Sequence, residues 1–93
     1  MTYISTHNAP KAIGPYSQGI SLDSANNGLI FTSGAIALTP SGEFINGDIK
    51  AQTKQVMQNL QAILKEAGSS LDKVLKTTCY LANMEDFSDF NAE

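Results

Sequence analysis

The sequence contains no arginine: the six basic residues among its 93 are all lysines, and the net charge is -3. Surfaces that bind nucleic acids show as clusters of basic residues, so scattered lysines in an acidic chain argue against a nucleic-acid partner. The absence also bears on small acids, because guanidinium is the side chain that holds a carboxylate by two parallel hydrogen bonds. The sequence therefore lacks the usual clamp for a small carboxylic acid.

Other features are scarce as well. The single cysteine, Cys79, cannot form a disulfide within the chain, and no apolar run approaches the ~18 residues that cross a membrane. The first residues do not show the basic and then apolar pattern of a secretory signal. No zinc-ligand spacing, phosphate-binding loop or serine-histidine-aspartate set is visible, so no metal site is apparent in the sequence. Together these absences predict a cytoplasmic protein without a membrane anchor.

What is present is the composition of an ordinary globular protein, with 42% hydrophobic and 16% charged residues. A chain of 93 residues has room for one domain and not for two, so residues 1–93 are predicted to form a single domain. Residues 17–22 and 29–33 alternate or are rich in β-formers, and turn-forming residues separate them. This pattern predicts a β-hairpin. A turn at 39–42 and a short strand at 43–45 follow.

The clearest element is an amphipathic helix over residues 49–67. Asp48 is a suitable N-cap, and Gly68 is suitable just beyond the C-terminus. Apolar residues and one threonine recur at three- and four-residue steps: Ile49, Thr53, Val56, Leu60, Ile63, Leu64 and Ala67. Such a stripe must be buried against another element, and a sheet is the available surface. The predicted fold class is therefore α+β.

After the helix, residues 74–81 are β-branched and aromatic and are predicted to form a strand, with Cys79 as a small core residue. Asn83 is a suitable cap for a second helix, which would present Met84, Phe87 and Phe90 on one face. This helix pattern stops at Glu93 without a capping residue. We therefore expect a domain that is incomplete at its C-terminal end.

Several motifs together resemble the RidA/YjgF family. They are PKAIGPYSQG at 10–19, IFTSG at 30–34, EAG at 66–68, DKVLKTT at 72–78 and MEDF at 84–87. The resemblance covers essentially the whole chain. It implies a fold like that of chorismate mutase, a mixed sheet with helices packed on one face, and a homotrimer with sites between subunits. It also implies hydrolysis of reactive 2-imino or enamine acids, such as 2-iminobutanoate and 2-iminopropanoate, to 2-keto acids and ammonia without a cofactor.

The same resemblance places Tyr16 and Ser33 as catalytic residues and Gly34 and Asn91 as substrate-binding residues. Each has a plainer interpretation. Tyr16 could be a tyrosine at the core edge with a solvated hydroxyl, and Ser33 a strand-end serine that bonds to backbone. Gly34 could be a bend that needs positive φ, and Asn91 an exposed helix residue.

One departure from the family concerns the substrate clamp. The resemblance implies an arginine and a catalytic glutamate in a region that follows position 93, so deaminase activity is expected to be impaired in this chain. The alternative is a small-ligand-binding or regulatory protein, of the kind once described as translation inhibitors or L-PSP endoribonucleases.

Overall fold

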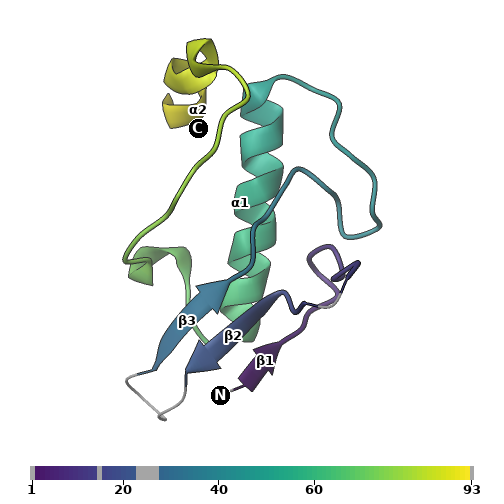
Figure 1. The fold of residues 1–93 in the computed structure, drawn as a ribbon, viewed down its shortest axis with the longest axis vertical. Coiled ribbons are helices and arrows are strands. Elements are labelled where there is room, and N and C mark those ends of the chain that lie inside the picture. The colour runs from purple at the N-terminus through teal and green to yellow at the C-terminus, as the bar shows by residue number, and fades with distance from the viewer. Residues whose placement is uncertain (1, 15, 23–27, 93) are drawn as a thin grey trace.

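The computed structural model describes residues 2–14, 16–22 and 28–92 (Figure 1). Three strands come first, and the long helix α1 follows them. Two short 3-10 helices and the final helix α2 complete the chain. In order, the elements are β1 (Thr2–Ile4), β2 (Gly19–Leu22), β3 (Leu29–Thr32), α1 (Ile49–Glu66), 3-10 helices at Leu71–Lys73 and Met84–Asp86, and α2 (Phe87–Ala92). The predicted α+β class is confirmed.

The strands form one sheet in the order β1-β2-β3, and both neighbouring pairs are antiparallel. The predicted hairpin is confirmed as β2 and β3, while the turn predicted at its tip falls mainly on residues 23–27, which lie outside the described residues. The predicted strand at 43–45 is reduced to a single bridge between Leu38 and Phe44. Parallel pairing, which a mixed sheet requires, does not occur among the described strands.

Helix α1 begins where the sequence predicts and ends one residue earlier, at Glu66, with Ala67 as its C-cap. The Asp48 side chain accepts a hydrogen bond from the Ala51 N–H, which would otherwise lack a partner in the first turn. At the other end Gly68 adopts a φ of 82°, a conformation that costs glycine little and other residues more. Every member of the predicted apolar stripe is buried or half-buried, and the lysines and glutamines opposite it are exposed.

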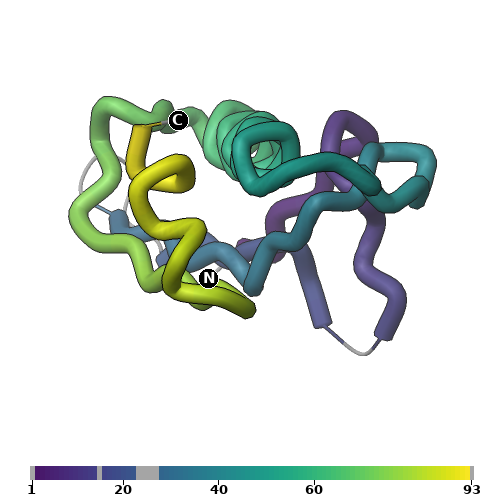
Figure 2. The backbone as a smooth tube through the Cα atoms, turned by 90° about the horizontal axis from the view of Figure 1, so that it is seen from above, coloured from purple at the N-terminus to yellow at the C-terminus, as the bar shows by residue number. Residues whose placement is uncertain are grey.

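The stripe packs on one face of the sheet. Figure 2, which looks down α1, shows the strands along one side of the helix. The core comprises Ile4, Ala9 and Ile63, with Ile30 packed against them. The helix approaches β2 closely at Gly19, where an added Cβ would lie 3.4 Å from the Ile63 side chain and 3.1 Å from the Phe31 carbonyl oxygen. A side chain at this position would fit only if the helix or the hairpin moved by a few tenths of an ångström.

The opposite side of the sheet is apolar and uncovered. Side chains alternate along a strand, so the residues that do not share the α1 side form a second surface. We call this surface the open sheet face, and it consists of Tyr3, Ile20, Leu22, Leu29 and Phe31. Tyr3, Leu22, Leu29 and Phe31 are exposed, Tyr3 to the extent of 73%. A sheet face of this composition is normally buried against another layer.

The strand predicted at 74–81 is wrong for this structure. The residues run without regular structure between the 3-10 helix at Leu71–Lys73 and the one at Met84–Asp86, and Leu75 and Tyr80 are 87% and 92% exposed. Cys79 is also exposed, so its assignment to the core is wrong as well. The physical reason is that β propensity reflects packing against neighbouring strands, and no described strand pairs with this segment.

The chain ends in α2, which lies near α1 (Figure 1). Asn83 caps the preceding 3-10 helix as predicted, because its side chain accepts a hydrogen bond from the Glu85 N–H. The Phe87 and Phe90 rings are 6.5 Å apart on α2, although Phe87 remains half exposed. Among the helices of the described ranges, none combines the length and the hydropathy needed to cross a membrane.

Candidate functional site

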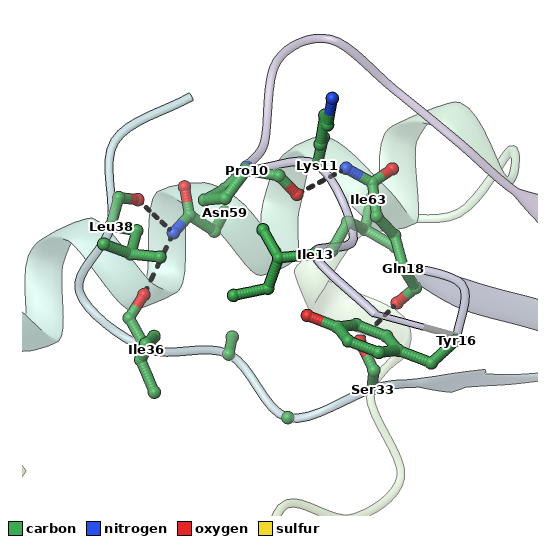
Figure 3. Close-up of a pocket in the computed structure, with 12 residues that line it drawn as sticks. Pro10, Lys11, Ile13, Tyr16, Gln18, Ser33, Ile36, Leu38, Asn59 and Ile63 are labelled. Atoms are coloured by element: carbon green, nitrogen blue, oxygen red, sulfur yellow. Dashed lines mark hydrogen bonds between the residues drawn. The ribbon is translucent and has the colours of Figure 1, made fainter. Parts of the chain in front are cut away.

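A cavity of about 280 Å³ lies between three parts of the fold (Figure 3). Its walls come from the lead-in before β2, from the segment that follows β3, and from the middle of α1. The described residues that line it are Pro10, Lys11, Ile13, Tyr16, Gln18, Ser33, Gly34, Ala35, Ile36, Leu38, Asn59 and Ile63. Most of these side chains are apolar, and a few polar groups are set among them, which is the usual composition of a small-molecule site.

The lead-in is held in place by the buried amide of Gln18. Its Oε1 accepts a hydrogen bond from the Thr6 N–H at 2.6 Å. Its Nε2 donates to the carbonyl oxygens of Thr6, Ala9 and Pro10 at 3.0, 3.3 and 2.8 Å. One side chain thus fixes a non-helical segment that has few backbone partners of its own. The Pro10 end of the cavity wall depends on this amide.

The opposite wall is held by Asn59, which is 2% exposed on α1. Its Nδ2 donates to the carbonyl oxygens of Ile36 and Leu38 at 3.2 and 2.8 Å, and its Oδ1 accepts from Gln55 Nε2 at 2.9 Å. These bonds tie the segment after β3 to the helix across more than twenty residues of sequence. Both buried amides therefore use their polar atoms to fix the walls.

Tyr16 and Ser33 lie next to each other at one end of the cavity. Figure 3 shows the Tyr16 ring beside Ser33, with its hydroxyl directed toward the middle of the cavity. The Ser33 hydroxyl donates to the Gln18 carbonyl oxygen at 3.1 Å, and the Ser33 N–H donates to the same oxygen at 3.0 Å. The geometry therefore agrees with the plainer interpretation, in which Ser33 is a strand-end serine that bonds to backbone. Ser33 nevertheless lines the cavity.

Charge is scarce at this site. Lys11 is the one cation among the described lining residues, and Figure 3 shows its ammonium directed away from the cavity. In the segment that lines the cavity after β3, no hydrogen bond between described residues uses the N–H groups of Gly34, Ala35 or Ile36. Elsewhere in the described ranges, no three histidine, cysteine, aspartate or glutamate residues gather as metal ligands.

Three of the four residues predicted for the site thus line one cavity: Tyr16, Ser33 and Gly34. The predicted bend with positive φ at Gly34 is wrong, since only Gly42 and Gly68 have positive φ among the described residues. Instead, open space lies where a Gly34 side chain would be. Asn91 is exposed on α2 and is not among the residues that line the cavity, so its role stays a prediction.

The sequence did not reveal the structural importance of Gln18 and Asn59. Both residues are common surface types, and both are buried here because their amides pair with backbone of distant segments. The one available signal was spacing: Asn59 lies three residues after Val56 and four before Ile63, so this polar residue shares the side of the apolar stripe.

Comparison with known proteins gives consistent results. The model of the family described as Endoribonuclease L-PSP matches residues 6–93. The chain is 55% identical to the Lactococcus lactis protein named "Putative regulator AldR", over 99% of this chain and 71% of that protein. It is 45% identical to the mouse 2-iminobutanoate/2-iminopropanoate deaminase, over 95% of this chain and 63% of the enzyme.

A solved structure agrees. The Escherichia coli protein TdcF, solved with bound serine, superposes with a TM-score of 0.90 at 36% identity, over 99% of this chain and 69% of TdcF. About three-tenths of TdcF has no counterpart in the 93 residues. The cavity and its walls thus belong to a known type of fold, and the chain is a member of the RidA/YjgF family, whose model carries the description L-PSP endoribonuclease.

Proposed function

We propose that these residues form part of the site of a deaminase that hydrolyses reactive 2-imino acids, such as 2-iminobutanoate and 2-iminopropanoate, to 2-keto acids and ammonia. The observation that carries the proposal is the meeting of Tyr16, Ser33 and Gly34 in one apolar-walled cavity. Its volume, about 280 Å³, suits a small molecule, since sites for drug-sized ligands hold about 300–1,000 Å³. The name of the mouse relative supports the same reaction.

The cavity supplies much of what the reaction requires. Water must add to the carbon of a C=N bond, and ammonia must then leave. The Tyr16 hydroxyl is directed inward, where it can orient the attacking water or the leaving nitrogen. The N–H groups of residues 34–36 provide fixed dipoles that can receive carboxylate oxygen. Ile13 and Ile36 line the cavity with apolar surface that can contact an aliphatic side chain of the substrate.

The cavity does not supply a cation for the carboxylate. The sequence has no arginine, and Lys11 turns away. Hydrogen bonds from a charged donor are roughly twice as strong as neutral ones, so neutral backbone N–H groups alone hold a carboxylate weakly. We therefore expect slow turnover by these 93 residues, with any contribution of Asn91 still to be measured.

A thiol that is exposed and unpaired, as Cys79 is, suits a reducing compartment such as the cytosol.

The open sheet face supports a homotrimer with sites between subunits. Tyr3, Leu22, Leu29 and Phe31 are exposed there, and a second copy of the chain would cover them. Sedimentation velocity of the wild type should show a species of about three times 9.9 kDa. Phe31→Lys should dissociate it, because a lysine in this face would be buried unpaired, whereas Gln61→Lys on the exposed side of α1 should not. A wild type that stays monomeric at all concentrations would contradict this assembly.

The activity is tested with imine made in situ. A pyridoxal-dependent threonine dehydratase releases 2-iminobutanoate, and the appearance of 2-ketobutanoate is followed with and without the chain. We expect a weak acceleration that falls about tenfold or more in Tyr16→Phe, since general acid–base groups contribute at least about 100-fold to typical enzymes. Tyr80→Phe is the control, because Tyr80 is 92% exposed and does not line the cavity.

Two results would count against this account. Turnover by the 93 residues at the full rate of complete relatives would refute the need for a guanidinium. Absence of both turnover and 2-ketobutanoate binding would refute the function itself.

A second candidate is a regulatory protein that binds a small ligand without turning it over. The name of the Lactococcus lactis relative and the lack of a cationic clamp favour it. Binding of 2-ketobutanoate without any acceleration of imine hydrolysis would select this candidate. An endoribonuclease is less consistent with a net charge of -3, and a salt-dependent mobility shift with RNA would reverse that judgement.

A further inference from the structure

One short stretch of the lead-in supplies a whole side of the cavity. It consists of residues 10–14 and 16, and we call it the cavity loop. Pro10, Lys11, Ile13 and Tyr16 line the cavity from this loop (Figure 3). Packing restrains the loop little, because Ile13 and Tyr16 are 81% and 53% exposed. Its position therefore depends mainly on hydrogen bonds.

One hydrogen bond between described residues ties the cavity loop to the rest of the fold. Gln18 Nε2 donates it to the Pro10 carbonyl oxygen at 2.8 Å. The Gln18 side chain is itself firmly held, since it is buried and makes three more hydrogen bonds to earlier backbone. Tyr16 precedes Gln18 by only two residues. Both ends of the loop are therefore held at the same residue.

The Tyr16 ring takes its direction from the cavity loop. Its N–H donates to the Gly14 carbonyl oxygen at 2.8 Å, a hydrogen bond within the loop. An added Cβ at Gly14 would lie 3.5 and 3.6 Å from two carbons of the Tyr16 ring, so the ring lies against the loop backbone. From there its hydroxyl is directed toward the middle of the cavity (Figure 3). A displacement of the loop would therefore move this hydroxyl.

We propose that Gln18 is a positioning residue for Tyr16. By holding the Pro10 carbonyl oxygen, its side-chain amide keeps the cavity loop, and with it the Tyr16 hydroxyl, in place at the cavity. This inference rests on the proposed function, in which Tyr16 orients the attacking water or the leaving nitrogen. A displacement of about 1 Å can slow a reaction about 100-fold, even when the substitution is remote from the reacting atoms. The walls from α1 and from the segment after β3 do not depend on this amide, so the KM should change little.

The first measurement concerns the loop itself. Gln18→Met keeps the length of the side chain and removes its donors and its acceptor. Backbone ¹⁵N relaxation should give order parameters of about 0.85 at Ile13 and Tyr16 in the wild type, and below about 0.6 in the variant. The amides of α1 should not change.

A second variant and a control accompany Gln18→Met. Gln18→Glu keeps an acceptor for the Thr6 N–H and offers at most one proton where the amide offers two, so it should also loosen the loop. Gln61→Glu makes the same chemical change on the exposed side of α1 and should leave both the order parameters and the turnover unchanged.

The second measurement separates positioning from a general loss of structure. In the dehydratase-coupled assay, Gln18→Met should lower kcat about tenfold, as far as Tyr16→Phe does, and change the KM less than about twofold. The double variant should be no slower than Tyr16→Phe alone, because an effect exerted through the Tyr16 hydroxyl disappears once that hydroxyl is absent. Effects on separate features of the site would instead multiply.

Circular dichroism verifies that each variant is folded. Unchanged order parameters in Gln18→Met, or rate losses that multiply in the double variant, would overturn the positioning role and leave the proposed function standing. The wild-type order parameters depend on no variant, and flexible loop amides there would overturn the role in the same way. If the folded wild type does not accelerate imine hydrolysis at all, the deaminase function and this inference are overturned together.

Discussion

Asn59 provides the sharpest test of how the cavity is held together. Substitution Asn59→Ala removes the donor that serves the carbonyls of Ile36 and Leu38, and the acceptor that serves Gln55. A lost hydrogen bond costs about 1 kcal/mol, and more where the stranded group is shielded from water. Leu38 is half-buried and Ile36 is exposed. Loss of the hydrogen bond to the Leu38 carbonyl should therefore destabilise the protein by about 1–2 kcal/mol, and loss of the bond to the Ile36 carbonyl by less.

An opposing term reduces this cost. Alanine is a better helix former than asparagine by roughly 0.5 kcal/mol, and position 59 lies in the middle of α1. The expected net loss is about 1–2.5 kcal/mol, out of a total stability of about 5–14 kcal/mol for a chain of this length. Urea unfolding followed by far-ultraviolet circular dichroism measures the difference.

Two further variants separate the causes. Asn59→Asp retains an acceptor for Gln55 but faces two carbonyl oxygens with a carboxylate, so it should be less stable than Asn59→Ala. Gln58→Ala changes the exposed neighbour in the same helix and should stay within about 0.5 kcal/mol of the wild type. If Asn59→Asp is as stable as the wild type, the donated hydrogen bonds do not hold the wall and the reasoning fails.

Three other substitutions test single features. Asp48→Ala should cost about 1 kcal/mol through loss of the N-cap, measured by urea unfolding; an unchanged midpoint would contradict the capping bond. Gly19→Ala should destabilise the protein by about 1–3 kcal/mol, because the added Cβ would lie 3.1 Å from the Phe31 carbonyl oxygen. Gly34→Ala has open space around the added Cβ, so its melting temperature should stay unchanged or rise slightly, while its affinity for the ligand should fall. Gly68→Ala should lower the melting temperature through its positive φ, by about 1 kcal/mol of stability, and equal melting of the two proteins would refute that strain.

Local signals were enough to predict α1. Its boundaries follow from Asp48 and Gly68, and its buried side follows from the spacing of residues such as Val56 and Ile63. The hairpin was predictable for a similar reason, since β2 and β3 are neighbours in sequence. The strand β1 was not predicted, because only three residues form it and its partner β2 lies well along the chain. Pairing at that distance leaves no periodic pattern.

Residues 74–81 illustrate the converse. Their β-branched and aromatic composition indicates that they fit a pleated, half-buried surface, but composition does not specify which strand provides that surface. Nothing pairs with them in the described part of the chain, so Tyr80 and Cys79 are exposed.

For the site, the sequence predicted the motif residues Tyr16, Ser33 and Gly34, but not Gln18 and Asn59, whose amides hold the cavity walls. The burial of Gln18 depends on carbonyls 8 to 12 positions earlier, which no local pattern encodes.

The proposed function would make affinity and turnover separable in this fold. A 2-imino acid and its 2-keto product share the same carboxylate, and the sequence has no arginine to hold it. A guanidinium brought to the cavity would therefore raise the affinity for substrate and product by the same factor and lower the KM, without lowering the barrier to the addition of water.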